Sequence, residues 1–117
     1  GAEKGAELLK TMVTMDEGAG YLGECALVPQ NSPICQSGLL FYNTLFDENA
    51  ACHLALGMGF ADTIKGFEDK TLDECRALGI NDSMIHVDFM IGSDDMEITG
   101  YKNGIATPIF VNGEWAN

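Results

Sequence analysis

The chain has 117 residues, of which 46% are hydrophobic, and a formal net charge of −12 at pH 7. This size fits one ordinary domain, and the hydrophobic fraction is typical of a globular protein rather than a disordered one. Because 18 acidic residues outnumber 6 basic ones, phosphate and anionic lipid are repelled, and we expect neither nucleic acid nor a membrane as a partner.

The N-terminus has no basic segment followed by an apolar core, so no signal peptide is predicted and a cytoplasmic protein is expected. The cysteines at positions 25, 35, 52 and 75 form no C-x-x-C pair, which argues against a zinc knuckle or a redox motif. Reduced thiols are therefore expected, with Cys25 and Cys52 as small buried residues.

The first half of the chain predicts mainly helices. Apolar residues at helical spacing indicate a helix over residues 5–16, and the short apolar run at 21–29 indicates a strand. A loop is predicted at 30–37, which contains Asn, Ser and Pro. Asp47 is placed to cap a further helix that stops at Gly57.

Further along the chain, Thr71 and Glu74 form a capping box, which predicts a short helix ending before residue 79. A strand is predicted at 85–91, and an Asn-Gly pair at 103–104 is a strong signal for a hairpin turn. The sequence therefore predicts an α+β fold, with helices in the first two-thirds and antiparallel β-hairpins in the last third, as one part of a larger catalytic domain.

Polar residues inside two of the predicted strands point to a metal site. Glu24 lies in an apolar strand, where a carboxylate is costly to bury unless a cation or hydrogen bonds compensate it. His86 and Asp88 are two residues apart, so their side chains share one face of a strand. An imidazole and a carboxylate on one face make half of a divalent-metal site, although a His-x-Asp pattern in a strand is more often a simple hydrogen-bonded pair.

The remaining histidine, His53, falls on the predicted helix five residues after Glu48. This spacing separates the two side chains by about 140° on an ideal helix, so they meet at one site only if the helix begins irregularly. Glu48 has a second interpretation as a favourable charge at a helix start. A cysteine hydrolase that uses His53 or His86 is a weaker alternative, because no nucleophile signature surrounds any cysteine.

Six stretches fall in one order along the chain and carry a resemblance to a known family: YLGECALV from residue 21, SGLLFYNTLFDENA from 37, CHLALG from 52, GINDS from 79, HVDFMIG from 86 and VNG from 111. The sequence resembles the thermophilic-type metallo-aminopeptidases, the group of aminopeptidase T, aminopeptidase S and PepS. The resemblance covers most of the chain from residue 16 onward.

The resemblance implies a set of five metal ligands: Glu24, Glu48, His53, His86 and Asp88. No catalytic residue is identified beyond these ligands. The family has a tyrosine seven residues after the ligand that His53 matches, and Phe60 stands there in this chain, without the hydroxyl.

The family's remaining glutamate ligand and its N-terminal domain lie upstream of the segment that resembles this chain. Residues 1–117 are therefore expected to be the C-terminal fragment of a metallo-aminopeptidase catalytic domain, with little activity alone. The implied partners are the missing N-terminal part of the same protein and, because the family is homodimeric, a second copy.

The implied reaction is hydrolysis of the first peptide bond of a peptide with a free N-terminus. Two divalent ions polarise the carbonyl and activate a water in such sites, and imidazole ligands favour zinc or cobalt over magnesium. The alternative function is a non-catalytic metal-binding or dimerisation module derived from the same fold.

Overall fold

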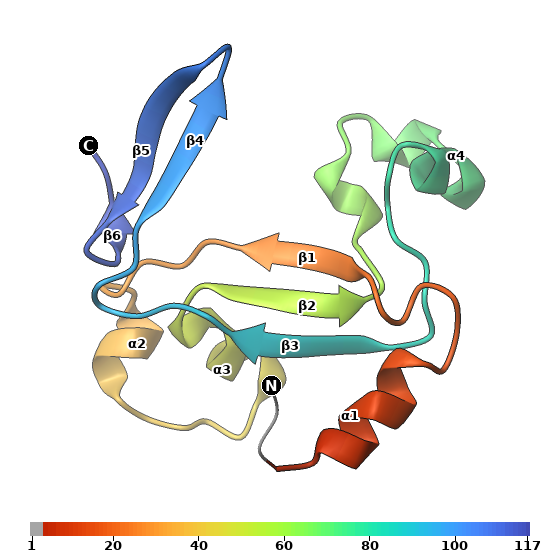
Figure 1. The fold of residues 1–117 in the computed structure, drawn as a ribbon, viewed down its shortest axis with the longest axis horizontal. Helices are drawn as coiled ribbons and strands as arrows, with labels where there is room; N and C mark the ends of the chain where they lie inside the picture. Colours follow the sequence, from red (N-terminus) through yellow and green to blue (C-terminus); the bar gives the residue numbers. More distant parts are fainter. Residues whose placement is uncertain (1–3) are drawn as a thin grey trace. The chain divides into compact units, whose positions relative to one another are not determined.

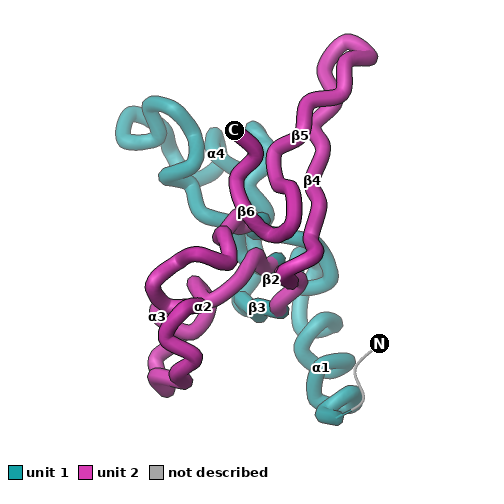
Figure 2. The backbone as a smooth tube through the Cα atoms, turned by 90° about the vertical axis from the view of Figure 1, so that its left-hand side faces the viewer, with its two compact units in different colours: residues 1–25, 54–89 teal, residues 26–53, 90–117 magenta. Residues whose placement is uncertain are grey.

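The computed structural model describes residues 4–117, apart from the side chains of residues 44 and 45. Two compact units make up the chain (Figure 2). Unit 1 contains the residues up to 25 together with residues 54–89, and unit 2 contains residues 26–53 and 90–117. Each unit therefore combines two segments that are distant in sequence.

The chain is built from short helices and short strands, with every described helix before β3 and only strands from β3 onward (Figure 1). The α-helices are α1 (Ala6–Val13), α2 (Pro33–Ser37), α3 (Thr44–Asp47) and α4 (Leu72–Ala77). The 3-10 helices are η1 (Glu48–Ala50), η2 (Ala61–Thr63) and η3 (Phe67–Asp69). The strands are β1 (Leu22–Ala26), β2 (His53–Gly57), β3 (His86–Met90), β4 (Ile98–Lys102), β5 (Ile105–Val111) and β6 (Glu114–Trp115). The predicted α+β class with antiparallel sheets is confirmed. None of the described helices is long and apolar enough to cross a membrane.

The first sheet has the strand order β1-β2-β3, and neighbouring strands run in opposite directions (Figure 1). At one end of the sheet, the Gly57 N–H donates to the Tyr21 carbonyl over 2.8 Å, and the Met58 N–H donates to the Ile85 carbonyl over 2.7 Å. The last residue of β2 therefore lies beside the entries to β1 and β3. Glu24 on β1 and His86 on β3 stand on opposite sides of this central strand.

Glycine allows the strands of unit 1 to approach one another closely. Gly57 has a φ of 97°, and a Cβ atom there would overlap the Ile85 carbonyl oxygen. A Cβ atom at Gly23 would overlap the Gly57 carbonyl oxygen in the same way. Any side chain at these two positions would force the strands apart, so the sheet geometry depends on their glycines.

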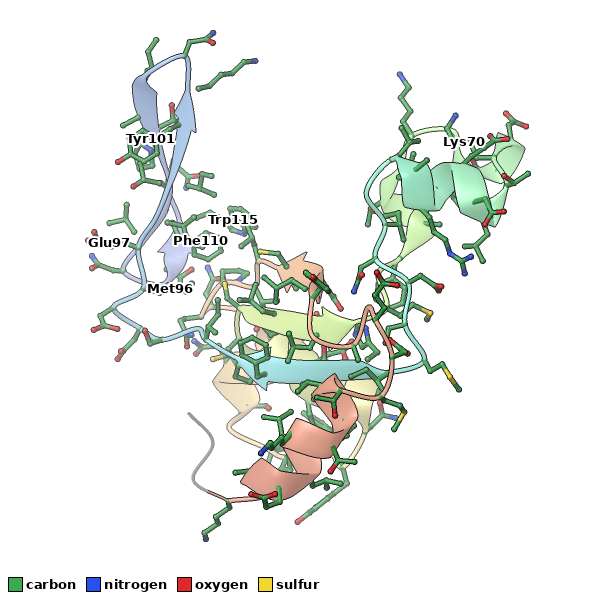
Figure 3. The ribbon with its side chains drawn as sticks, turned by 45° about the vertical axis from the view of Figure 1, so that its right-hand side comes forward. Lys70, Met96, Glu97, Tyr101, Phe110 and Trp115 are labelled. Carbon is green, nitrogen blue, oxygen red and sulfur yellow. The ribbon has the colours of Figure 1, made fainter. Side chains whose placement is uncertain are left out.

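The second sheet has the order β4-β5-β6 and belongs to unit 2. Lys102 pairs with Ile105 at the end of the β4–β5 hairpin, and the turn residues Asn103 and Gly104 both have positive φ, 52° and 77°. This conformation matches the right-handed twist of hairpin strands and explains the predicted Asn-Gly turn. The rings of Phe110 and Trp115 lie 4.5 Å apart near the β6 end of the hairpin (Figure 3).

The predicted helix that follows Asp47 is wrong. Helix α3 ends at Asp47, whose carboxylate oxygens accept hydrogen bonds from the backbone N–H groups of Phe41 (2.8 Å) and Asn43 (3.1 Å). Asp47 thus caps the turn before it instead of a helix after it. The next apolar segment forms β2, in which alternate residues are buried. An apolar run of this length fits the sequence pattern of a strand as well as that of a helix, which is why the prediction failed here.

Two further predictions are wrong, and one is confirmed at atomic detail. The loop predicted at 30–37 contains α2, which starts where the Ser32 hydroxyl accepts from the Cys35 N–H over 3.2 Å. Cys25 is exposed rather than buried, whereas Cys52 is buried as predicted. The capping box before α4 is present, because the Thr71 hydroxyl accepts from the Glu74 N–H over 3.2 Å.

Candidate metal centre

Three of the predicted ligands converge within unit 1. The Nε2 atom of His86 lies 3.1 Å from Oε2 of Glu24 and 3.3 Å from Oδ1 of Asp88. One ligand atom from each side chain lies within 4.8 Å of the other two, and all three residues are partly buried. Strands β1 and β3 supply these groups, so residues more than sixty positions apart form one cluster.

The orientation of His86 is fixed by a backbone carbonyl. Nδ1 of its ring lies 2.8 Å from the carbonyl oxygen of Met58. A carbonyl only accepts hydrogen bonds, so Nδ1 must carry the proton and the neutral ring presents a lone pair at Nε2. Histidines that ligate metals are held by this kind of hydrogen bond, which sets the tautomer and aims the free nitrogen.

The Nε2 atom of His86 lies among hydrogen-bond acceptors, the carboxylates of Glu24 and Asp88. The buried Oδ1 atom of Asp88 has no hydrogen-bond donor among the described residues, and its neighbour Nε2 is an acceptor in the neutral ring. Glu24 adds a second carboxylate at 3.1 Å from Nε2. A divalent metal ion placed between these acceptors would compensate their negative charge and satisfy their lone pairs.

The donor set fits a divalent metal. One imidazole nitrogen and two carboxylates suit zinc and other borderline ions, whereas an all-oxygen set suits magnesium or calcium. The three residues would hold the ion from β1 and β3 on either side of β2. Glu24, His86 and Asp88 therefore fit a divalent metal ion such as zinc.

A cleft of about 460 Å³ opens beside Glu24 in unit 1. Its walls are β1, from Gly23 to Cys25, and the segment that contains Phe60, Asp62 and Thr63. The ring of Phe60 also lies 5.1 Å from the ring of His86, centroid to centroid. An aromatic ring therefore lies both beside the ligand cluster and in the wall of the cleft.

The other two predicted ligands belong to unit 2. Glu48 is the first residue of η1 and is partly buried. His53 begins β2, is only 1% exposed, and its Nδ1 atom lies 3.0 Å from the carbonyl oxygen of Ala51. His53 therefore resembles His86 in that its Nδ1 atom contacts a backbone carbonyl, to which it donates. Because His53 begins a strand, the angular separation expected for Glu48 and His53 on one helix does not apply.

Asp16 carries a shifted pKa elsewhere in unit 1. The Met84 backbone N–H, which donates to Oδ2 over 2.7 Å, lowers the pKa of Asp16 from its ordinary value of 3.8. Burial opposes this effect, and the hydroxyl of Ser83 adds to it from 3.1 Å. Asp16 thereby ties the segment after α1 to the approach to β3.

Sequence reasoning missed the groups that orient the ligands. The anchor of His86 is the Met58 carbonyl, and a backbone carbonyl gives no signal in residue identity. Asn81 contacts both neighbours of Met58, and in the sequence it stands out only as part of the stretch GINDS. An asparagine between a helix and a strand usually indicates a turn, so its long-range contacts could not be predicted.

The chain matches the thermophilic metalloprotease (M29) family over residues 1–115. It is 56% identical over 116 residues to aminopeptidase AmpS of Bacillus subtilis, and 51% identical over 115 residues to aminopeptidase PepS of Streptococcus thermophilus. These alignments cover 98% and 97% of the chain.

The fold agrees with a solved relative. The structure of AmpT from Thermus thermophilus superposes with a TM-score of 0.84 at 46% identity, covering 99% of this chain and 28% of that one. The chain also spans only 28% of the length of AmpS and of PepS. With the matched family, the similar relatives and the shared fold in agreement, this chain belongs to the thermophilic metalloprotease (M29) family of metallo-aminopeptidases.

Proposed function

We propose that this chain supplies ligands for a two-metal site in a metal-dependent aminopeptidase, which releases N-terminal residues from peptides. The observation that carries the proposal is the cluster of Glu24, His86 and Asp88 around Nε2, with Nδ1 held by the Met58 carbonyl. Family membership supports the activity, and the donor set supports zinc or cobalt as the metal.

Each residue has a chemical task in this proposal. Glu24 and Asp88 offset the positive charge of the site, and the Nε2 lone pair of His86 completes the donor set. When bound, divalent ions supply a Lewis acid for the scissile carbonyl and a water that is deprotonated near neutral pH. Phe60 packs against the ring of His86, and the cleft beside Glu24 provides space for the end of the peptide.

Glu48 and His53 are proposed as the further ligands of the two-metal site. His53 supports this role because its ring is buried and its Nδ1 is anchored on the Ala51 carbonyl, as at His86. Residues 1–117 then act as the C-terminal part of a catalytic domain. The remaining part of the same protein is one partner of this chain, and a second copy is the other.

A chimaeric enzyme tests this function. The matching segment of the Bacillus subtilis relative is replaced by this chain, and hydrolysis of leucine p-nitroanilide is measured with zinc or cobalt and after treatment with a chelator. We expect metal-dependent hydrolysis that His86→Ala lowers by about 10³-fold or more, because a lost ligand removes both the Lewis acid and the activated water.

The alternative is a non-catalytic module that binds metal without hydrolysis. Phe60 is the observation that favours it, because a phenyl ring without a hydroxyl stands 5.1 Å from His86, where the family is expected to have a tyrosine. A folded chimaera that binds metal but does not hydrolyse the substrate would support this alternative. If Phe60→Tyr then restored hydrolysis, the difference would be assigned to that single hydroxyl.

A further inference from the structure

Asn81 occupies the junction of three segments of unit 1. Its Nδ2 group donates to the carbonyl oxygens of Gly57 (2.6 Å) and Gly18 (2.8 Å), and it lies 3.4 Å from that of Tyr21. Its own backbone carbonyl accepts from the Gly59 N–H over 2.9 Å. A single residue thus joins the entry to β1, the exit from β2 and the approach to β3.

These contacts enclose Met58. Asn81 holds Gly57 through its side chain and Gly59 through its main chain, so both neighbours of Met58 are fixed. The Met58 N–H donates to the Ile85 carbonyl over 2.7 Å. With the residue held on both sides, the direction of its carbonyl is determined, and this carbonyl is the one that receives Nδ1 of His86.

We propose that Asn81 is a positioning residue for the metal centre, acting through the Met58 carbonyl to aim Nε2 of His86 at Glu24 and Asp88. The inference rests on the proposed metal centre and assigns Asn81 no contact with metal or substrate. Its contacts with Gly18 and Tyr21 act at the other wall of the site, because they fix the backbone that leads into β1 and Glu24.

The substitution Asn81→Asp tests this role because it keeps the size of the side chain. A carboxylate in this position would face the carbonyl oxygens of Gly57 and Gly18, so attraction would become repulsion. Asn81→Ala removes the side-chain hydrogen bonds without adding repulsion, and it is the second variant, to be used if Asn81→Asp does not fold. Thr71→Ala is the matched control, since it removes the cap of α4 in the same unit and leaves Met58 untouched.

The experiment measures zinc affinity by competition with a chromophoric chelator, and the visible spectrum of the cobalt-loaded chain, below the Tm of every variant. We expect Asn81→Asp to weaken zinc binding by about 10- to 100-fold, the range seen when residues that support a ligand are changed, and to alter the cobalt spectrum. Asn81→Ala should fall between Asn81→Asp and the unchanged chain. Thr71→Ala should lower the Tm while both metal readouts stay as in the unchanged chain.

The outcomes separate the two proposals. If the unchanged chain binds zinc and the folded Asn81 variants bind it equally well with the same cobalt spectrum, Asn81 is only structural and the inference is overturned. If Thr71→Ala weakens zinc binding as much as the Asn81 variants do, the effect follows stability, and the inference is again overturned. If the unchanged chain itself binds no zinc, the proposed metal centre fails, and the role of Asn81 fails with it.

Discussion

The β4–β5 hairpin of unit 2 and the three-stranded sheet of unit 1 are both antiparallel, yet they are specified in different ways. The hairpin strands are joined by Asn103 and Gly104, and each residue pairs with one nearby in sequence. In unit 1, Glu24 meets His86 across more than sixty residues, and glycines at positions 23 and 57 permit the approach. Local signals are sufficient for the hairpin, whereas the candidate metal centre depends on close packing between distant segments.

The largest expected effect breaks this packing in unit 1. Gly57→Ala adds a Cβ atom that overlaps the Ile85 carbonyl oxygen, at a residue whose φ of 97° is already unfavourable for alanine. We expect the free energy of unfolding to fall by about 3 kcal/mol or more in denaturant titrations. Gly79→Ala is the control, because its φ is 109° with nothing within 4 Å, and it should cost only about 1 kcal/mol. Equal losses at both glycines would contradict the role of close approach.

The next largest effect is expected from Asp88→Asn, which should weaken zinc binding but stabilise the metal-free chain. Asp88→Asn removes the carboxylate of a proposed ligand, so zinc affinity should fall by about 100-fold or more, beyond the range of about 10- to 100-fold for residues that only support a ligand. Without metal, an amide beside Nε2 of His86 can donate a hydrogen bond, and the free energy of unfolding should rise by up to about 1 kcal/mol. Chelator competition and metal-free denaturation measure the two quantities. A metal-free variant that is less stable than the unchanged chain would contradict this account.

A smaller effect is expected in the hairpin. Gly104→Ala places alanine at a φ of 77°, which should lower the free energy of unfolding by about 1 kcal/mol. Zinc affinity should remain unchanged, because the turn holds no proposed ligand. Denaturation and zinc titration of the same preparation check both statements. A loss of zinc binding in this variant would show that the two regions are less separate than the comparison holds.

The smallest effect concerns pH. The folded pKa of Asp16 is lowered, chiefly by the Met84 N–H, so the charged carboxylate stabilises unit 1 at pH above its ordinary 3.8. This stabilisation is lost as the pH falls through the lower folded value. The stability difference between the unchanged chain and Asp16→Asn should therefore be constant near pH 7 and shrink below about pH 4. Denaturation at several pH values checks this, and a difference that grows on acidification would contradict it.

The sequence predicts those parts of the fold that depend on neighbouring residues. The capping box of Thr71 and the Asn-Gly turn at 103–104 were found because each is local chemistry. The segment after Asp47 was predicted wrongly because the carboxylate of Asp47 binds backbone groups that precede it. A run of five residues such as β2 satisfies helix and strand patterns alike, and only its neighbours β1 and β3 decide between them.

The candidate metal site was likewise predictable only where it depends on neighbouring residues. Glu24, His86 and Asp88 could be singled out because each is a polar residue in an apolar strand, which requires compensation. Only the family resemblance implied that they meet at one site, because the pattern of each strand does not fix the order of the strands in the sheet. The hydrogen bonds to the Met58 carbonyl and from the Asn81 side chain could not be predicted either, because a bond to a distant backbone carbonyl leaves no pattern in the sequence.

The most direct test of the central claim is the zinc content of the chain after loading and dialysis, compared with His86→Ala and with the surface control Asp94→Asn. We expect the chain to retain at least one zinc ion per molecule, Asp94→Asn to retain the same amount, and His86→Ala to lose it. If the folded chain retains no zinc, or if His86→Ala retains as much as the unchanged chain, then Glu24, His86 and Asp88 do not form the metal centre that we propose.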